Sequence, residues 1–458
     1  MKIGFLSLGC PKNLVDSEVM MGLLAARGHQ LTSSAAEAEA LVVNTCGFIR
    51  PAQQESVDAI LEMAQYKKTG RARKLIVAGC LVERWRQQIR DQIPEVDAVI
   101  GTNEIGQIVA LCEAIPAEAS PASPEPYLYH ELTPRVRATP PHLAYVKIAE
   151  GCDHPCTFCV IPQYRGRFRS RPWQGVVAEA GRLFDEGVRE ITLIGQDTTC
   201  FGEDLGLKDG LASLLDRLAG IENAGWIRVL YAYPNKITSR LLDSLAAGPP
   251  LCKYIDMPLQ HSSAAVLKRM KRGGSGDIFL RLLERIRDAI PGVSLRTSLI
   301  AGFPGETETD FQQLCHFVEA AQFDHLGVFA YSDEESSASY HLDGKIDART
   351  IYNRRRRLLA LQRRISRRRL REKIGGTLPV LVEGVSRETD LLWQGRLEGQ
   401  ALEIDGQVYI NDIEGPPPAP GDFGLVRITE SRDYDLVGTL LGAGRQARRG
   451  PPALRVLQ

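Results

Sequence analysis

Short apolar runs alternate with helical patterns over the first 115 residues. The runs KIGFLSLGC, ALVVNTC and KLIVAGC are each followed by an amphipathic stretch, the first of which extends from Asp16 to Arg27 and stops at Gly28. A strand followed by a helix, repeated along the chain, is typical of a parallel sheet. The pattern therefore predicts an α/β fold with an open parallel sheet over residues 1–115.

The alternation resumes after a segment rich in proline, alanine and serine. Residues 116–142 contain AEASPASPEP and ATPPH, a composition typical of a linker. From residue 143 onward six strands are expected, at AYVKI, ITLIG, WIRVL, YIDM, LRTSLI and HLGVFAY, and a helix from about Arg349 to Lys373 closes the unit. Residues 143–373 are therefore predicted to form a partial (β/α) barrel, with its site at the carboxyl ends of the strands.

Alternation with a period of two replaces the helical pattern after residue 373. The segments LPVLVEG, WQGRLE, VYIND, FGLVRIT and DLVGTL are separated by turns of glycine, proline and aspartate. Five such strands predict a small all-β barrel over residues 374–442. Residues 443–458 are expected to be a disordered tail.

The composition is that of an ordinary globular protein, with 44% hydrophobic and 24% charged residues. Lysine plus arginine equals aspartate plus glutamate, so the total charge does not indicate a partner. The opening apolar run is too short for a signal peptide, and no stretch is long enough to span a membrane. We therefore expect a cytoplasmic protein whose ten cysteines are reduced and serve metal binding, catalysis or packing.

The sequence GCDHPCTFC places three cysteines on one loop after a predicted strand. Cys152, Cys156 and Cys159 are separated by four and three residues. Three thiolates can hold three corners of an iron-sulfur cube and leave the fourth iron open. An open iron can chelate S-adenosylmethionine and yield a carbon radical able to attack an unactivated C–H bond. A zinc site made of these cysteines and His154 is the alternative.

Three further cysteines each end one of the first three predicted strands. Cys10, Cys46 and Cys80 lie 36 and 34 residues apart, which is one βα unit each. Loops at the carboxyl ends of neighbouring parallel strands share one crevice, so these thiols are expected to converge on a second cluster. The remaining cysteines follow no such pattern and are expected to be packed side chains; they are Cys112, Cys200, Cys252 and Cys315.

Three other segments are expected at the same rim of the partial barrel. Gln196, in IGQDTT, could reach a cofactor or belong to a plain turn, and His261, in PLQHSS, could be functional or structural. The glycines of AGFPGET would let the backbone approach a ligand closely.

The chain as far as about Leu441 resembles the radical-SAM methylthiotransferase family. The motifs that carry the resemblance are LGCPKNLVDSE, VNTCGFI, QESVDAILE, AEGCDHPCTFCVIP, GQDTT, YIDMPLQHSS, LKRMKRGG and GFPGETETDF. They are most similar to members that modify a ribosomal protein, whereas members that modify transfer RNA usually carry a Gln-Met-Asn type sequence in place of Pro11-Lys12-Asn13. Cys200-Phe201 departs locally from the family, where a tyrosine is expected.

The resemblance implies a TRAM barrel at the C-terminus and two 4Fe-4S clusters. Cys152, Cys156 and Cys159 match the radical-SAM ligands, and Cys10, Cys46 and Cys80 match the auxiliary ligands. It further implies that an aspartate of ribosomal small-subunit protein S-twelve receives a methylthio group on its β-carbon. The reaction would consume two molecules of S-adenosylmethionine and would need an electron donor and a sulfur donor. A radical route suits that carbon, because it is neither acidic nor electrophilic enough for other routes.

The charge distribution gives an independent indication of the substrate. Residues 374–441 hold no lysine, four arginines and twelve acidic residues, a formal net charge of −8. Barrels that bind nucleic acid need cationic grooves, so this one favours a basic protein, although a merely soluble surface is an alternative. Ten arginines between Arg354 and Arg371 precede it. They could be a solvated face, neutralise the barrel or contact ribosomal RNA transiently.

Two other functions remain open from the sequence. One is a transfer-RNA methylthiotransferase, which the Pro11-Lys12-Asn13 sequence and the acidic barrel disfavour. The other is a non-catalytic iron-sulfur or RNA-binding protein, which would have no need of an open iron and would leave the third domain unexplained.

Overall fold

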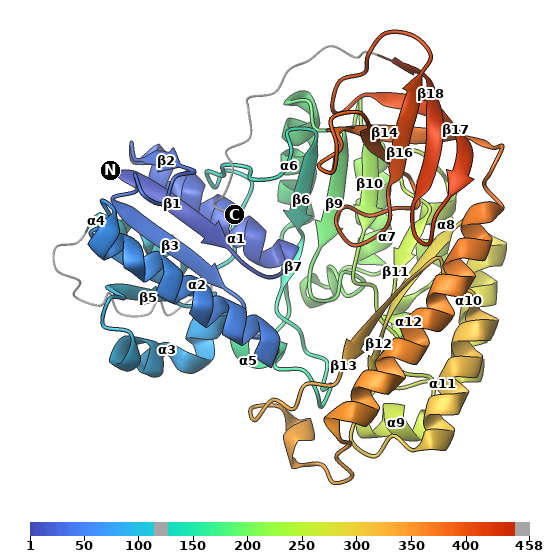
Figure 1. The fold of residues 1–458 in the computed structure, drawn as a ribbon, viewed down its shortest axis with the longest axis horizontal. Helices are drawn as coiled ribbons and strands as arrows, with labels where there is room; N and C mark the ends of the chain where they lie inside the picture. Colours follow the sequence, from blue (N-terminus) through green and yellow to red (C-terminus); the bar gives the residue numbers. More distant parts are fainter. Residues whose placement is uncertain (114–126, 445–458) are drawn as a thin grey trace.

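The computed structural model describes residues 1–113 and 127–444, so nearly all of the predicted tail lies outside the described residues. The N-terminal α/β unit lies to one side of the central partial barrel, and the C-terminal barrel lies at one end of it (Figure 1). No helix in the described part of the chain has the length and apolar character that crossing a bilayer requires.

The N-terminal unit is a parallel sheet with the strand order β2-β1-β3-β4-β5. Its strands are β1 (Lys2–Ser7), β2 (Gln30–Thr32), β3 (Ala40–Thr45), β4 (Lys74–Gly79) and β5 (Ala98–Ile100). Its helices are α1 (Pro11–Ala26), α2 (Arg50–Thr69), α3 (Cys80–Gln92), η1 (Ile105–Gln107) and α4 (Ile108–Glu113). Apolar residues of α1 and α4 cover one face, and those of α2 and α3 cover the other.

The prediction of a parallel sheet is confirmed, with two differences. The sheet has two more strands than the three expected, because β2 and β5 are only three residues long and give no periodic signal. Helix α1 begins at Pro11 rather than Asp16, directly after Cys10. Proline is favoured in the first helical turn, where its missing N–H would have no partner.

The central unit contains the six predicted strands, in two parallel three-stranded sheets joined by a bridge between Ile227 and Leu251. The strands are β6 (Leu143–Lys147), β9 (Glu190–Ile194), β10 (Trp226–Val229), β11 (Tyr254–Asp256), β12 (Ser294–Ala301) and β13 (His325–Ala330), with the small pair β7 (Ala149–Glu150) and β8 (Arg169–Ser170). An apolar core lies between these strands and the surrounding helices.

The helices of the central unit follow the strands in the expected alternation. They are α5 (Ile161–Arg165), α6 (Trp173–Asp185), α7 (Gly210–Ala219), α8 (Ser239–Ala246), α9 (Ala264–Arg269), α10 (Gly276–Ala289), α11 (Glu308–Ala321) and α12 (Ala348–Arg371), with short 3₁₀ turns η2 (Glu203–Leu205), η3 (Pro234–Lys236) and η4 (Ala338–His341).

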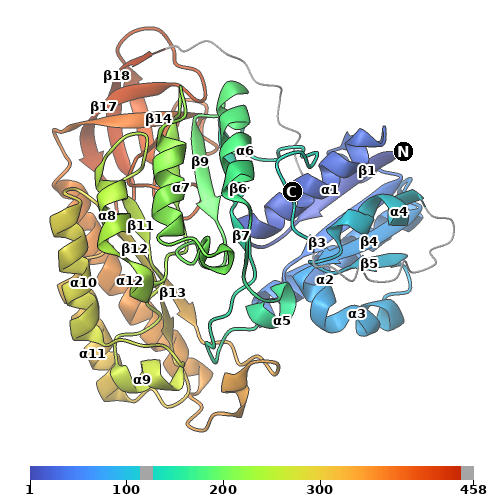
Figure 2. The same ribbon diagram turned by 180° about the vertical axis from the view of Figure 1, so that it is seen from behind.

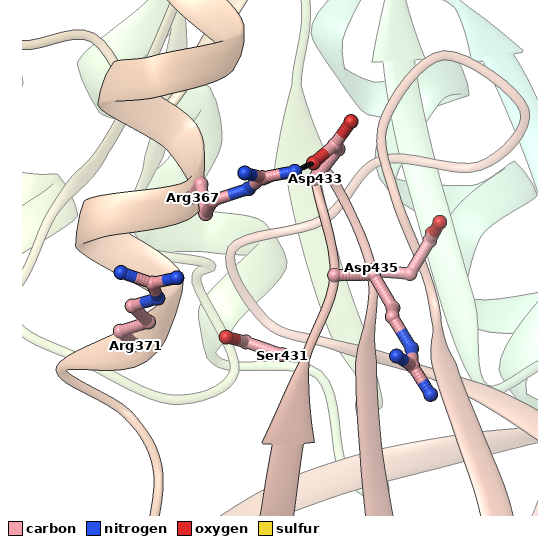
Figure 3. Close-up of a pocket in the computed structure, with 6 residues that line it drawn as sticks. Arg367, Arg371, Ser431, Asp433 and Asp435 are labelled. Atoms are coloured by element: carbon pink, nitrogen blue, oxygen red, sulfur yellow. Dashed lines mark hydrogen bonds and ion pairs between the residues drawn. The ribbon is translucent and has the colours of Figure 1, made fainter.

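The C-terminal unit is a closed five-stranded barrel, as predicted, with the strand order β14-β15-β16-β18-β17. Its strands are β14 (Thr377–Val385), β15 (Trp393–Leu397), β16 (Val408–Ile413), β17 (Phe423–Ser431) and β18 (Leu436–Gly444). Helix α12 leads into it, and Arg367 of α12 pairs with Asp433 in the turn between β17 and β18 (Figure 3).

Buried charges attach the barrel to the amino ends of the central strands. Glu190, the first residue of β9, pairs with Arg228 at 2.7 Å and with Arg396 of the barrel at 2.5 Å. All three side chains are buried. Burial opposes ionisation of Glu190, but the two guanidinium groups outweigh it and lower its pKa to about 2. The barrel therefore closes the amino end and leaves the carboxyl ends of the strands to the loops.

The described part of the predicted linker packs against both neighbouring units. Tyr129 is buried, and Arg135 pairs with Glu18 of α1 at 2.5 Å and with Glu179 of α6 at 2.9 Å. Proline, alanine and serine are frequent over residues 116–142 as a whole, but Tyr129 and Arg135 anchor the described part. Residues 127–142 thus join the N-terminal unit to the central one.

Replacing Glu190 by alanine is expected to destabilise the protein by about 3–5 kcal/mol, because two buried guanidinium groups lose their carboxylate. The midpoint of urea unfolding, followed by the fluorescence of Trp226 beside this contact, measures the loss. Because the pKa of Glu190 is depressed, its stabilisation is present above the ordinary pKa of 4.5 and is lost as the pH falls toward 2. The difference between variant and wild type should therefore shrink below pH 4.

The exposed Asp390 of the same barrel provides the control. Asp390→Ala should change stability by less than about 0.5 kcal/mol, as surface substitutions usually do. Equal losses in the two variants would mean that the buried ion pairs do not hold the barrel in place.

Candidate functional site

The three N-terminal cysteines lie at one edge of the first sheet. Cys10 precedes α1, Cys46 follows β3, and Cys80 is the first residue of α3. Strands β1, β3 and β4 are parallel neighbours, so their carboxyl ends meet at this edge. A Cβ atom on Gly9 would lie only 3.0 Å from the sulfur of Cys46, so the absence of a side chain there lets the loops approach. The structure thus brings together the thiols that the sequence placed in equivalent positions.

Asn13 fastens the first two cysteine loops to each other. Its side-chain amide donates to the carbonyl oxygens of Leu8, Asn44 and Thr45, at 2.7, 3.3 and 3.1 Å. Asn44 in turn donates to the carbonyl oxygen of Asn13 at 2.8 Å. Because these groups are buried or nearly so, each hydrogen bond removes a polar atom that would be costly to leave unpaired. The asparagine of the Pro-Lys-Asn sequence therefore has a structural role.

Positive charge lies beside these thiols. Burial opposes ionisation of Cys10, but the charges of Lys12 and Arg165 and the backbone N–H groups of the first helical turn outweigh it and lower its pKa. Burial raises the pKa of Cys46, and it raises that of Cys80 to about 12 although Arg165 donates toward the sulfur of Cys80 at 3.6 Å. Of the three thiols, that of Cys10 therefore loses its proton most readily.

Arg165 comes from the central unit, directly after the second cysteine loop. Helix α5 lies beside α2 and α3 of the N-terminal unit (Figure 2), where Val160 and Tyr164 pack against Cys80. The guanidinium of Arg165 is 1% exposed and pairs with Asp16 of α1 at 2.9 Å and Glu150 of β7 at 3.1 Å.

Two more side chains complete this buried ionic group. Lys147 contacts both Asp16 and Glu150, at 2.5 and 2.6 Å, and Gln196 donates to Glu150 at 2.7 Å. Burial opposes ionisation of Glu150, but the two cations lower its pKa strongly. The predicted rim residue Gln196 thus belongs to the contact that joins the two units.

The second cysteine loop lies between β7 and α5. Cys152 donates its backbone N–H to Gly166 at 3.2 Å, and Cys159 donates to the carbonyl of Cys156 at 3.1 Å. Arg272 donates to the sulfur of Cys156 at 3.5 Å. Burial raises the pKa of Cys152 to about 11 and that of Cys159 to about 12.

The side chain of His154 bonds to a carboxylate rather than joining the cysteines. Its Nε2 lies 2.6 Å from Asp197 Oδ2, and its ring stacks on Tyr233 with centroids 3.9 Å apart. Cys200 donates to the same carboxylate at 3.1 Å. These contacts disfavour the alternative of a zinc ion held by three cysteines and His154, and they show that Cys200 has a polar partner, whereas it was expected only to pack.

A loop after β10 contacts both cysteine sites. Tyr231 has a left-handed backbone with φ 64°, and the Nζ of Lys12 lies 3.3 Å from its ring centroid. Two residues later, Tyr233 stacks on His154, and Arg272 lies 4.4 Å from its centroid. Strained backbone at such a rim is often associated with a functional site. Neither tyrosine was among the predicted site residues, although both follow a predicted strand directly, which was a usable signal.

The other predicted rim residues mainly hold loops in place. His261 is fully buried, its Nδ1 accepts from the N–H of Ser263 at 2.9 Å, and burial lowers its pKa to about 4. In AGFPGET, Glu306 accepts from the N–H of Gly302 at 2.6 Å and pairs with Arg354 at 2.9 Å. The structural interpretation of His261 is the one that this geometry favours.

The remaining three cysteines are packed, as expected. Cys112 and Cys252 are buried, and Cys315 lies against the core of the central unit. Phe201, which stands where the family resemblance leads one to expect tyrosine, is also fully buried. A hydroxyl at that position would need a buried partner, which the phenyl ring does not.

Replacing Arg165 by methionine is expected to weaken the contact between the N-terminal and central units by about 3–5 kcal/mol, because Asp16 and Glu150 lose a buried counter-charge. Hydrogen exchange of the amides in α1 and α5 of the protein as purified should accelerate. Arg165→Lys keeps the charge but loses the planar fork, so it should be intermediate. Arg167→Met is the control, since that side chain is 90% exposed; acceleration in the control as well would contradict the assignment.

Models of three families match successive parts of the chain. They are Uncharacterized protein family UPF0004 over residues 2–101, the Radical SAM superfamily over residues 146–318 and the TRAM domain over residues 374–441. These matches agree with the three units of the fold and with the motif resemblance.

Full-length relatives and one solved structure extend the comparison. The chain is 69% identical over 443 residues to ribosomal protein uS12 methylthiotransferase RimO of Solibacter usitatus, covering 96% of this chain and 95% of that protein. It is 56% identical to the protein of the same name from Koribacter versatilis, covering 96% of each. The radical S-adenosylmethionine methyltransferase TsrM of Kitasatospora setae has a similar fold, with a TM-score of 0.54 at 13% identity over 80% of this chain and 89% of that one.

The identity to these relatives extends through all three units and confirms the resemblance found in the motifs. The chain belongs to the RimO family of radical-SAM methylthiotransferases.

Proposed function

We propose that this chain adds a methylthio group to the β-carbon of an aspartate in ribosomal small-subunit protein S-twelve. Its relatives at 69% and 56% identity are named for ribosomal protein uS12 and for methylthio transfer. One observation carries the proposal, namely that the loop of Tyr231 and Tyr233 contacts both cysteine sites. A reaction that joins sulfur from one site to a carbon activated at the other needs a face shared by both.

We assign Cys152, Cys156 and Cys159 to the cluster that binds S-adenosylmethionine, and Cys10, Cys46 and Cys80 to an auxiliary 4Fe-4S cluster. A single zinc ion holds its thiolates about 3.8 Å apart. Among the described residues, the one set of three ligand groups within 4.8 Å of one another is His154, Asp197 and Cys200, so neither cysteine set has closed to the spacing of a zinc site. This result disfavours a single zinc ion at either site, and the match of residues 146–318 to the Radical SAM superfamily supports a 4Fe-4S cluster at the second one.

When bound, such a cluster with an open iron supplies the electron that makes S-adenosylmethionine a source of carbon radicals. The chain's own residues prepare the two sites. Cysteine ligands must lose their protons, and Lys12, Arg165 and Arg272 supply the positive charge that favours the thiolates. The rings of Tyr231 and Tyr233 lie beside the two sites, against Lys12 and His154.

Several acidic residues of the C-terminal barrel pair within the protein, so its surface is less negative than the net charge of its sequence indicates. The argument for a basic protein partner is correspondingly weaker. Glu383, Glu398 and Asp405 contact the central unit, and Asp433 pairs with α12. The exposed acids that remain include Glu388, Asp390, Glu403 and Asp412. They leave a negative surface that would attract a basic ribosomal protein.

The arginines of α12 support a ribosomal RNA contact. Eight of them are exposed: Arg355, Arg356, Arg357, Arg363, Arg364, Arg367, Arg368 and Arg371. Among the described residues, Glu308 pairs with Arg357, and Asp433 pairs with Arg363 and Arg367. The last arginines line a hollow of about 480 Å³ beside the barrel (Figure 3). We therefore propose a transient contact of α12 with ribosomal RNA. The reaction would also need an electron donor and a sulfur donor as partners.

The proposal predicts which substrate is modified. Protein reconstituted with iron and sulfide without oxygen is given S-adenosylmethionine, a reductant and either a peptide of the target loop or transfer RNA. Mass spectrometry should find the methylthio group on the peptide aspartate and none on the RNA, with 5′-deoxyadenosine as a coproduct. Modified RNA with unmodified peptide would overturn the choice of substrate, and the absence of both product and coproduct would overturn the enzymatic proposal.

The auxiliary cluster is tested through Gly9, whose φ is 86° and whose added Cβ would lie 2.8 Å from the Cβ of Cys46. Gly9→Ala should displace Cys46 and lower the iron content after reconstitution from about eight to about four atoms per chain. Gly28→Ala is the matched control, because Gly28 has φ 83° but no atom within 4 Å of an added Cβ. Eight iron atoms in both variants would contradict the assignment of Cys46.

A further inference from the structure

Lys12 differs from the other buried cations of this protein. Seven lysine and arginine residues are buried in the part of the chain that the structure describes. Six of them form an ion pair with at least one carboxylate: Lys147, Arg165, Arg171, Arg228, Arg354 and Arg396. Lys12 is only 8% exposed, and its ammonium group contacts no carboxylate among the described residues. Lys12 is therefore the one buried cation of the described residues without a carboxylate partner, although it lies beside the thiol of Cys10.

The acidic residue nearest along the helix cannot serve Lys12. Asp16, one turn later in α1, is engaged by Lys147 and by Arg165. The neighbours that Lys12 does have are the ring of Tyr231, 3.3 Å from its Nζ to the centroid, and the thiol of Cys10 two residues before it. A cation over an aromatic face is stabilised, but such a contact does not neutralise the charge.

The position of Lys12 indicates which kind of group would bind beside it. The residue stands between the N-terminal cysteines and the loop of Tyr231, whose other tyrosine contacts His154 in the second cysteine loop. This is the face that both sites share. A substrate whose carbon reacts there must bring its neighbouring groups there too, and the β-carbon of aspartate carries a carboxylate one bond away.

We propose that Lys12 binds the side-chain carboxylate of the target aspartate and so selects that residue type. The inference rests on the proposed function and adds to it the group that recognises the substrate. Binding would give Lys12 the carboxylate partner that the other buried cations already have, and it would place the β-carbon between the two sites. The ring of Tyr231 keeps the ammonium in position and limits its access to water, which strengthens the ion pair.

The test crosses two enzymes with two substrates. Wild type and Lys12→Met are each assayed with the target peptide and with a peptide in which the aspartate is replaced by asparagine. Wild type should favour the aspartate peptide by at least about 30-fold in kcat/KM, the effect expected for truncating one partner of a buried charge pair. Lys12→Met should lose that factor on the aspartate peptide and stay within about threefold of wild type on the asparagine peptide.

Further measurements separate recognition from damage to the sites. Rates are expressed per chain that holds both clusters, because Lys12 also lowers the pKa of the Cys10 thiol. Binding of the aspartate peptide without reductant should weaken in Lys12→Met by a similar factor. Lys12→Arg should recover part of the preference because it keeps the charge. Lys236→Met is the matched control: this rim lysine already pairs with Glu203 at 2.7 Å and should behave as wild type.

Each contrary result has one meaning. Equal losses on the two peptides, with the rates expressed in this way, would overturn the recognition role and assign Lys12 to the cysteine site or to S-adenosylmethionine. An unchanged preference for aspartate would overturn it as well. If wild type modifies neither peptide, the proposed function fails, and the binding comparison then decides whether Lys12 discriminates a carboxylate from an amide.

Discussion

The burial of one guanidinium group, that of Arg165, governs how the two cysteine sites are placed. A buried arginine requires counter-charges, and this one finds them on two units, in Asp16 of α1 and Glu150 of β7. It also donates toward Cys80, while its own helix begins two residues after Cys159. The N-terminal unit cannot swing away from the central one without exposing or unpairing that charge. The distance between the two sites is therefore set by this ionic contact together with the anchored part of the connecting segment.

The opposite end of the partial barrel is closed by the same kind of contact. Glu190 holds two arginines, one of them from the C-terminal barrel, at the amino ends of the strands. The two ionic groups act at opposite ends of the central strands. The group around Glu190 fixes the C-terminal barrel at the amino ends, and the group around Arg165 fixes the cysteine sites at the carboxyl ends. The loops that carry Tyr231 and His261 then lie at a rim bounded by rigid parts, which is where a site needs precise placement.

The sequence predicted the features that depend on periodicity and spacing. The cysteines at strand ends, the six central strands and the five barrel strands all follow from local patterns. Arg165 could not be found this way, because it is one of several arginines in YRGRFRSR and only its burial distinguishes it. Tyr231 and Lys12 are 219 positions apart, and no local pattern relates them. Strands β2 and β5 are three residues each, too short for a period to be visible.

The structure also divides the roles within Pro11-Lys12-Asn13. Asn13 holds the cysteine loops together through three carbonyl groups. Pro11 begins the helix. Lys12 projects a charge onto the face shared by the two sites. Two of these residues therefore build the cysteine site, and the third is the one whose charge suits the carboxylate of the proposed substrate.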